Sequence, residues 1–267
     1  MAFGNSRQEE RTKETTQKFD PIYLNSKQGK RVIRILGSEV SYKVYWLEVN
    51  VAGKDDTISK GQRPVIVAVY RDGEWLAHED DDNWYENPYQ AVINALPEEK
   101  QKGLYARTRF VVNVYDRTPV ALINDLVVYP DDNGQYISGS KEQPTTEPHN
   151  KIMLLEGSSG KVGGKHMLQK IMNISNELVS YSTGKPVTLA DADIQMITNG
   201  QGIDTDRSFI PGMNQLPIEY AHTDLYDLES FIKPWPHVAI NALLTGAEYN
   251  ATRDEYKLPA FAKKFES

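Results

Sequence analysis

Five short runs of β-branched and aromatic residues in the first half of the chain most constrain what it can fold into. They lie at residues 31–36, 42–51, 64–70, 107–115 and 120–129. Short runs of this kind, bounded by turn-forming residues, are typical of β-strands. The third run begins with Pro64, and proline is tolerated at the first residue of a strand. The sequence therefore predicts a mainly β fold.

Helical patterns are fewer and lie between or after these runs. Residues 87–96 indicate a helix with Pro88 at its first position, where the missing N–H is harmless. Later in the chain we expect strands over 151–156 and 190–198, and helices over 165–181 and 237–244. Several short strands with one intervening helix fit a small barrel of the OB type. We therefore expect an α+β fold, mainly β with added helices, in which an OB-like five-stranded barrel core carries long insertions and C-terminal additions.

The chain divides into three parts by composition. Residues 1–19 are polar, charged and aperiodic, which predicts a mobile N-terminal arm. Residues 130–150 hold three prolines and two glycines, which is typical of a long loop or linker. We expect residues 20–249 to form the OB-like domain and residues 250–267 to form a C-terminal tail. The sequence leaves open whether the second half is a separate domain or completes the first.

The composition excludes several kinds of site. The chain has no cysteine, so it has no disulfide and no thiolate metal site. None of its five histidines lies at metal-ligand spacing from another, and we expect no metal and no cofactor. No apolar run approaches the roughly 20 residues of a membrane helix, and the N-terminus lacks the apolar core of a signal peptide. We therefore expect a cytoplasmic protein with no membrane partner.

Charge is unevenly distributed along the chain, although the net charge is −7. Residues 21–71 carry nine basic and four acidic residues, and residues 100–117 carry five and one. The intervening residues 72–99 carry nine acidic residues and no basic one. Screening confines the field of an exposed charge to about 10 Å at moderate salt, so local charge decides what a surface attracts. Two basic blocks are compatible with nucleic-acid binding; ordinary variation of surface charge is the alternative.

Strand 107–115 has two different faces, because successive side chains alternate. One face is apolar and predicts a core, with Thr108, Phe110, Val112 and Val114. The other is basic and aromatic, with Arg107, Arg109, Val111, Asn113 and Tyr115. In strand 42–51, Tyr42 and Trp46 would likewise stand outside the barrel core. Rings that stack on unpaired bases, beside cations that follow phosphates, suit a single-stranded nucleic acid; the alternative is that each ring fills a core.

The candidate nucleic-acid-binding residues are basic or aromatic, with one asparagine, and lie on the predicted strands and their turns. They are Arg34, Tyr42, Lys43, Trp46, Tyr70, Arg71, Trp75, Arg107, Arg109, Asn113, Tyr115 and Arg117. Trp75 follows Gly73, which indicates the tip of a hairpin.

Catalytic templates do not fit the chain. Residues 157–165 are rich in glycine, but Ser159 replaces the first glycine of a phosphate-binding loop and His166 follows the lysine. Four aspartates resemble a nuclease cluster only loosely: Asp191, Asp193, Asp204 and Asp206. We therefore expect no enzymatic activity.

Three segments in order resemble the single-stranded-DNA-binding proteins of tailed bacteriophages: residues 109–116, 151–157 and 193–205. The resemblance covers roughly residues 20–215. It implies an OB fold and sequence-independent binding of single-stranded DNA in the cytoplasm of an infected bacterial host. It also implies contacts with replication, recombination or transcription proteins. The resemblance also favours a binding role for four residues in or next to the first segment, Arg107, Arg109, Asn113 and Tyr115.

The chain departs from that family at two points. It lacks the Cys and His ligands of the members that carry zinc, and it ends in a basic, aromatic segment instead of an acidic tail. We expect this segment to contact a partner protein such as a polymerase through Lys263, Lys264 and Phe265; a frayed helix end is the alternative. Two other functions remain open, a phage structural or protein-interaction module and a nuclease or other replication enzyme.

Overall fold

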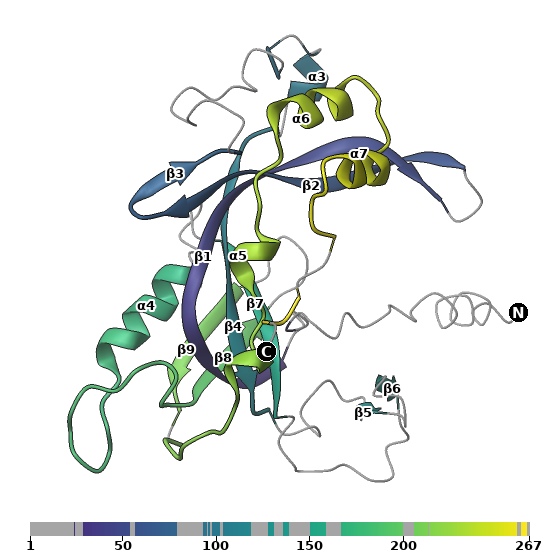
Figure 1. The fold of residues 1–267 in the computed structure, drawn as a ribbon. Helices are drawn as coiled ribbons and strands as arrows, with labels where there is room; N and C mark the ends of the chain where they lie inside the picture. The colour runs from purple at the N-terminus through teal and green to yellow at the C-terminus, as the bar shows by residue number, and fades with distance from the viewer. Residues whose placement is uncertain are drawn as a thin grey trace, which may run out of the picture.

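One seven-stranded antiparallel sheet dominates the computed structural model of the chain (Figure 1). The residues described are 24, 29–53, 57–78, 93–94, 96, 98–101, 104–118, 128–130, 136–138, 150–158, 167–199, 206–212, 214–260 and 263–265. The predicted arm over residues 1–19 lies outside these ranges. Most of the acidic segment 72–99 and most of the predicted linker 130–150 also lie outside them.

The main sheet has the strand order β3-β2-β1-β4-β7, with β8 paired to the start of β1 and β9 paired to β8. Its strands are β1 (Gly29–Ala52), β2 (Ile58–Arg71), β3 (Glu74–Leu76), β4 (Arg107–Asp116), β7 (Lys151–Ser158), β8 (Ile194–Asn199) and β9 (Asp206–Pro211). A separate ladder joins β5 (Val128–Pro130) to β6 (Tyr136–Ser138). The helices are α3 (Glu98–Gln101), α4 (Met167–Glu177), α5 (Leu228–Phe231), α6 (His237–Leu244), α7 (Tyr249–Glu255) and the 3-10 helix η3 (His222–Asp224).

The first two predicted strands are parts of one strand, β1, which is 24 residues long and strongly curved (Figure 1). Its pairing with β4 is irregular between Leu36 and Val40, where Gly37 has a φ of +70°. Glycine adopts that backbone conformation without the steric cost that a side chain would add. The irregularity lets one strand continue from the β8 end of the sheet to the β2 end.

The prediction of a mainly β protein with added helices is confirmed, whereas the OB-like barrel is not. Among the described strands, β3, β7 and β9 each pair with a single neighbour. The sheet is therefore open, because a barrel requires its edge strands to pair with each other.

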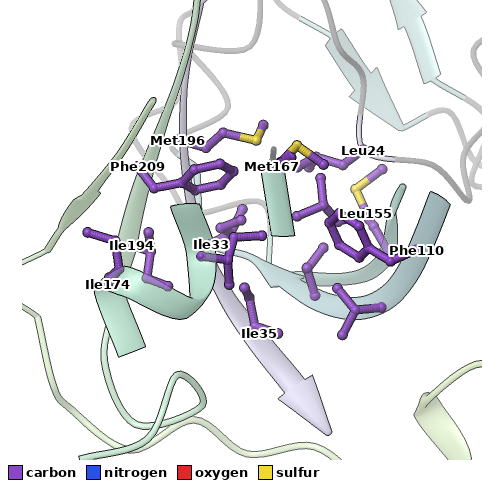
Figure 2. Packing of buried hydrophobic residues seen from close by; sticks show 14 of the residues in the cluster. Leu24, Ile33, Ile35, Phe110, Leu155, Met167, Ile174, Ile194, Met196 and Phe209 are labelled. Carbon is purple, nitrogen blue, oxygen red and sulfur yellow. The ribbon is translucent and has the colours of Figure 1, made fainter. Parts of the chain in front are cut away.

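The largest core cluster lies between the sheet and α4 (Figure 2). From β1 it includes Ile33 and Ile35, and from β4 it includes Phe110, which is fully buried. Helix α4 contributes Met167 and Ile171. The predicted core face of strand 107–115 is confirmed for Phe110, Val112 and Val114, but not for Thr108. The helix predicted over 165–181 is present as the shorter α4.

The segment after β9 covers both faces of the sheet in turn. Val44 packs with α5 and the adjacent Tyr45 packs with α6, and neighbouring residues of a strand face opposite sides. Between the two helices, the N–H of Trp235 donates to the carbonyl oxygen of Ile66 over 2.7 Å. Ile66 belongs to the part of β2 that β3 does not pair with, because the pairing of β3 with β2 ends at Val69. The chain therefore passes from one face to the other around the free edge of β2.

The C-terminal residues pack on the rest of the protein, which differs from the predicted tail over 250–267. Helix α7 spans the expected boundary, and Leu258 is buried in the same cluster as α6. The N–H of Asp227 donates to the carbonyl oxygen of Lys263 over 2.8 Å, and the N–H of Phe265 donates to that of Leu225 over 3.0 Å. The reason is that Leu258 packs in the cluster of α6, while the backbone pairs fix residues 263–265 against residues 225–227. No helix in the described ranges is both long and apolar enough to cross a membrane.

Candidate nucleic-acid interface

On one face of the sheet, a strip of residues lies between the core cluster covered by α4 and the core cluster covered by α6. On this face Ser41 pairs with Phe110, in the cluster beneath α4, and Tyr45 lies in the cluster beneath α6. Lys43 lies between them and pairs with both Thr108 and Ala68. It therefore marks the gap between the two parts of this face that the described helices cover.

Tyr70 and Trp75 extend this strip toward the edge of the sheet. Tyr70 lies two residues after Ala68, hence on the same face, and pairs with Trp75 across the β2–β3 hairpin. The two-residue turn has a positive φ at Asp72 (50°) and at Gly73 (88°), as a tight hairpin turn requires. The hairpin tip predicted at Gly73 is confirmed. We call Lys43, Thr108, Tyr70 and Trp75 the uncovered strip.

The rings and the cation of the uncovered strip touch one another. The ring centroids of Tyr70 and Trp75 lie 5.2 Å apart, and the Lys43 Nζ lies 4.5 Å from the centroid of the Trp75 ring. Tyr70 remains 45% exposed, while Lys43 and Trp75 are half-buried. Burial lowers the pKa of the Lys43 ammonium below its ordinary value. Three residues that the sequence singled out thus form one aromatic and basic surface.

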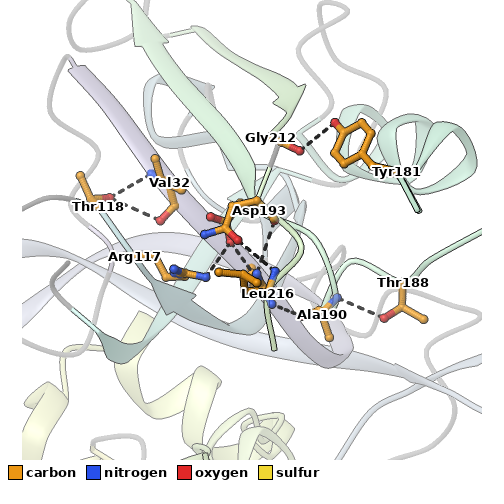
Figure 3. A network of polar contacts seen from close by, with 11 residues as sticks. Val32, Arg117, Thr118, Tyr181, Thr188, Ala190, Asp193, Gly212 and Leu216 are labelled. Carbon is orange, nitrogen blue, oxygen red and sulfur yellow. Dashed lines mark hydrogen bonds and ion pairs between the residues drawn. The ribbon is translucent and has the colours of Figure 1, made fainter. Parts of the chain in front are cut away.

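Two predicted binding residues, Arg34 and Arg117, instead bind a buried aspartate, Asp193. Figure 3 shows Arg117 beside Asp193. The Arg34 Nε donates to the Asp193 Oδ1 over 2.7 Å, and the Arg117 Nη1 lies 3.5 Å from the same oxygen. Arg34 also donates to the carbonyl oxygens of Ala190 and Asn214, and its side chain is only 1% exposed. These contacts hold the segments before β8 and after β9 against β1, so Arg34 is not on an open face.

Tyr42 and Arg109 share a different carboxylate. The Tyr42 hydroxyl donates to the Glu156 Oε1, and the Arg109 Nε donates to the same oxygen over 2.7 Å. Tyr42 is buried beneath α5, which contradicts the expectation that it stands outside the core. Burial disfavours the charged form of Arg109, but Glu156 and Tyr42 outweigh it and raise the pKa of its guanidinium. Much of the Arg109 charge is therefore compensated within the protein.

The expected basic face of β4 is covered by residues 225–232. The Asn113 Nδ2 donates to the carbonyl oxygen of Tyr226 over 3.0 Å, and the N–H of Tyr226 donates to the Asn113 Oδ1 over 2.9 Å. Asn113 is 5% exposed, Val111 is buried beside Leu228, and Tyr115 is half-buried. The prediction of an open face fails here because a later part of the chain packs on it.

The remaining candidates lie apart from the uncovered strip. Arg107 is exposed, with its guanidinium carbon 5.1 Å from the centroid of the Tyr105 ring. Tyr105 is 51% exposed and was missed as a candidate, although its spacing from Arg107 was a usable signal. Trp46 is half-buried at the wall of a cleft, and the Arg71 Nη2 donates to the Glu229 carbonyl oxygen over 3.3 Å.

The three predicted partner-binding residues contact the protein itself. The Lys264 Nζ lies 5.7 Å from the Tyr226 ring centroid, and the rings of Phe265 and His222 lie 4.2 Å apart. Lys263 and Lys264 are exposed and Phe265 is half-buried. The lysines therefore remain accessible beside a docked aromatic ring.

Comparison with known proteins assigns no family to the chain. No protein-family model matches it, and no curated protein matches it significantly in sequence.

Proposed function

We propose that the protein binds single-stranded DNA without sequence preference, with the uncovered strip as a stacking surface. The observation that carries this proposal is the contact between the exposed Tyr70 ring and the half-buried Trp75 ring, with the Lys43 ammonium on the Trp75 ring. The same proposal includes a role in phage replication, recombination or transcription in the host cytoplasm. It also includes a partner protein such as a polymerase, and a sheet related to the OB fold. It is supported by the sequence resemblance described above.

The chemistry of the strip suits an unpaired base. Every base has a π-face that can stack on an aromatic side chain, whereas in a duplex these faces are already stacked. Stacking contributes about 1–3 kcal/mol per base and is tolerant of sequence. Lys43 can attract a phosphate next to a stacked base, since its ammonium lies at the ring and the residue is only half-buried.

Replacing Trp75 by alanine should weaken binding of a fluorescent oligo-dT about 5- to 150-fold, the equivalent of about 1–3 kcal/mol for one stacked base. Fluorescence anisotropy at low salt measures this, with duplex DNA and magnesium as controls for strand preference and cleavage. Tyr181→Ala is the matched control, since Tyr181 is 60% exposed on the loop after α4 and outside the strip. Unchanged affinity in Trp75→Ala, or a loss of equal size in Tyr181→Ala, would refute the strip as the binding surface.

Replacing Lys43 by glutamine should make binding less dependent on salt. Each phosphate neutralised on a single strand contributes about −0.7 to the slope of log affinity against log salt. The slope should therefore become about 0.7 less negative in Lys43→Gln, as measured by repeating the titration across salt concentrations. Lys185→Gln is the control, because Lys185 is exposed on the loop after α4. An unchanged slope in Lys43→Gln would remove the phosphate contact from the proposal.

A protein-interaction module is the second candidate, because apolar side chains gather after α4. Val179, Tyr181 and Leu216 are 46%, 60% and 68% exposed. Gln215 holds the two segments together, since it donates to the Val179 carbonyl oxygen and accepts from the Tyr181 N–H. If wild-type protein binds no single-stranded DNA at low salt, this function becomes the better one.

A further inference from the structure

A cleft runs along the part of β1 that β4 does not reach. The pairing of β4 with β1 ends at Arg107, which lies opposite Val44. Beyond it, a cleft of about 570 Å³ is lined by residues 46–50 of β1, by Leu104 and by the C-terminal end of α6. We call this the edge cleft. Its volume falls within the roughly 300–1,000 Å³ that small-molecule sites have.

Polar side chains of the edge cleft lie on one face of the β1–β2 ladder. Glu48 pairs with Gln62 and Asn50 pairs with Lys60, so these four share a face with Trp46. Arg107 belongs to the same face, because it pairs with Val44, two residues before Trp46. Arg107, Glu48, Gln62 and Lys60 are all exposed.

The two cations are at unequal distances from the indole. Strands rise about 3.3 Å per residue, so Arg107 is about 7 Å from Trp46 along the strand and Lys60 is about 13 Å away on the other side. A small ligand at Trp46 is therefore closer to Arg107 than to Lys60.

The indole of Trp46 has an unmet hydrogen bond. Its Nε1 is buried and has no hydrogen-bond partner among the residues that the structure describes. A buried donor without a partner costs about 1–3 kcal/mol and is uncommon in folded proteins. Trp46 itself lines the edge cleft, so an acceptor of a ligand bound there would need only a local side-chain movement to reach this donor.

We propose that the edge cleft binds one nucleotide unit, with the base at Trp46 and the phosphate at Arg107. A base supplies an aromatic face and hydrogen-bond acceptors for the indole N–H, and a phosphate suits an exposed guanidinium. The choice of a nucleotide over another aromatic anion rests on the proposed function. The Trp46 ring, the Arg107 cation and the unpaired indole N–H are features of the structure and do not depend on that function. The unit can be a free mononucleotide or one nucleotide of a bound strand, and these share the same chemistry.

The test follows the indole N–H resonances of full-length protein labelled with [15N]tryptophan. Trp46→Phe identifies the Trp46 signal, and circular dichroism checks that this variant folds. Titration with dTMP or dAMP should shift the Trp46 signal saturably, and Arg107→Gln should weaken this binding about tenfold, as expected for a lost charged hydrogen bond. Lys60→Gln should leave mononucleotide binding within about twofold, given its distance, but weaken the effect of oligo-dT.

The outcomes separate this proposal from the stacking strip. A shift of Trp46 with mononucleotide supports a free nucleotide, and a shift only with oligo-dT supports a strand as the source. If neither ligand moves the Trp46 signal, the proposal is overturned, even where oligo-dT binds and Trp75→Ala weakens that binding. If mononucleotide moves Trp46 but oligo-dT does not bind, the edge cleft stands and the proposed function fails.

Discussion

Replacing Asp193 by alanine is expected to lower the free energy of unfolding by about 3–5 kcal/mol, the usual result of removing one partner from a buried ion pair. The Arg34 side chain is 1% exposed and its Nε would lose the 2.7 Å contact to the Asp193 carboxylate. Its two remaining acceptors are carbonyl oxygens at 3.4 Å, which cannot balance a full charge. Urea denaturation of wild type and variant measures the difference.

The matched control is Glu177→Ala, which removes an exposed carboxylate from the last turn of α4 and should change stability by less than about 0.5 kcal/mol. A second variant tests the cause. Changing Arg34→Met together with Asp193→Leu should recover part of the lost stability, because apolar side chains replace a buried pair with little loss, although Arg117 still loses its contact with Asp193. A loss below about 1 kcal/mol in Asp193→Ala would show that Arg34 reaches water or another acceptor.

Replacing Phe110 by alanine is expected to cost about 3–5 kcal/mol of unfolding free energy, as for other buried aromatic residues. Phe110 is fully buried on β4 in the cluster beneath α4. Its surroundings are tightly packed: a Cβ placed on Gly157 would lie 2.9 Å from the Phe110 ring and 2.0 Å from the Met167 Cε. The neighbouring side chains are therefore already in close contact, and they have little freedom to shift into the cavity that the substitution leaves.

Two controls make the Phe110 result interpretable. Phe110→Leu should lose clearly less stability than Phe110→Ala, since it keeps most of the apolar volume. Ile210→Ala, on the edge strand β9, should have a small effect because Ile210 is 46% exposed. Equal losses in Phe110→Leu and Phe110→Ala would argue that ring shape, not cavity volume, determines stability at this position.

The sequence predicts those helices, strands and turns whose conformation is determined by residues close together in the chain. The helix over 237–244 is α6 with the same bounds, and the strand over 151–156 lies within β7. The hairpin at Gly73 depends on a two-residue turn and was recognisable from the glycine. In each case neighbouring residues determine the conformation, so the pattern carries enough information.

The exposure of a polar residue could not be predicted in the same way. Asn113 and Arg34 look equally suited to an open binding face or to a buried contact, because alternation along a strand does not reveal what covers it. Their partners are 113 and 159 residues away in the chain. For the candidate site, the pairing of Tyr70 with Trp75 follows from the hairpin, whereas the contact with Lys43 depends on strand register that the sequence does not state.

The pairing of β1 with late strands also has a consequence for synthesis of the protein. Arg34 leaves the ribosome 159 residues before Asp193, which at typical rates of translation is roughly 8–30 s. During that time residues 29–33, at the start of β1, lack their eventual partner strand β8, and an unpaired strand edge is prone to aggregation. Arg31, Arg34 and Lys43 interrupt β1 with charge, and charged residues within apolar strands oppose such association. Arg34, which ties the finished sheet together through Asp193, is thus also expected to limit association of the nascent chain.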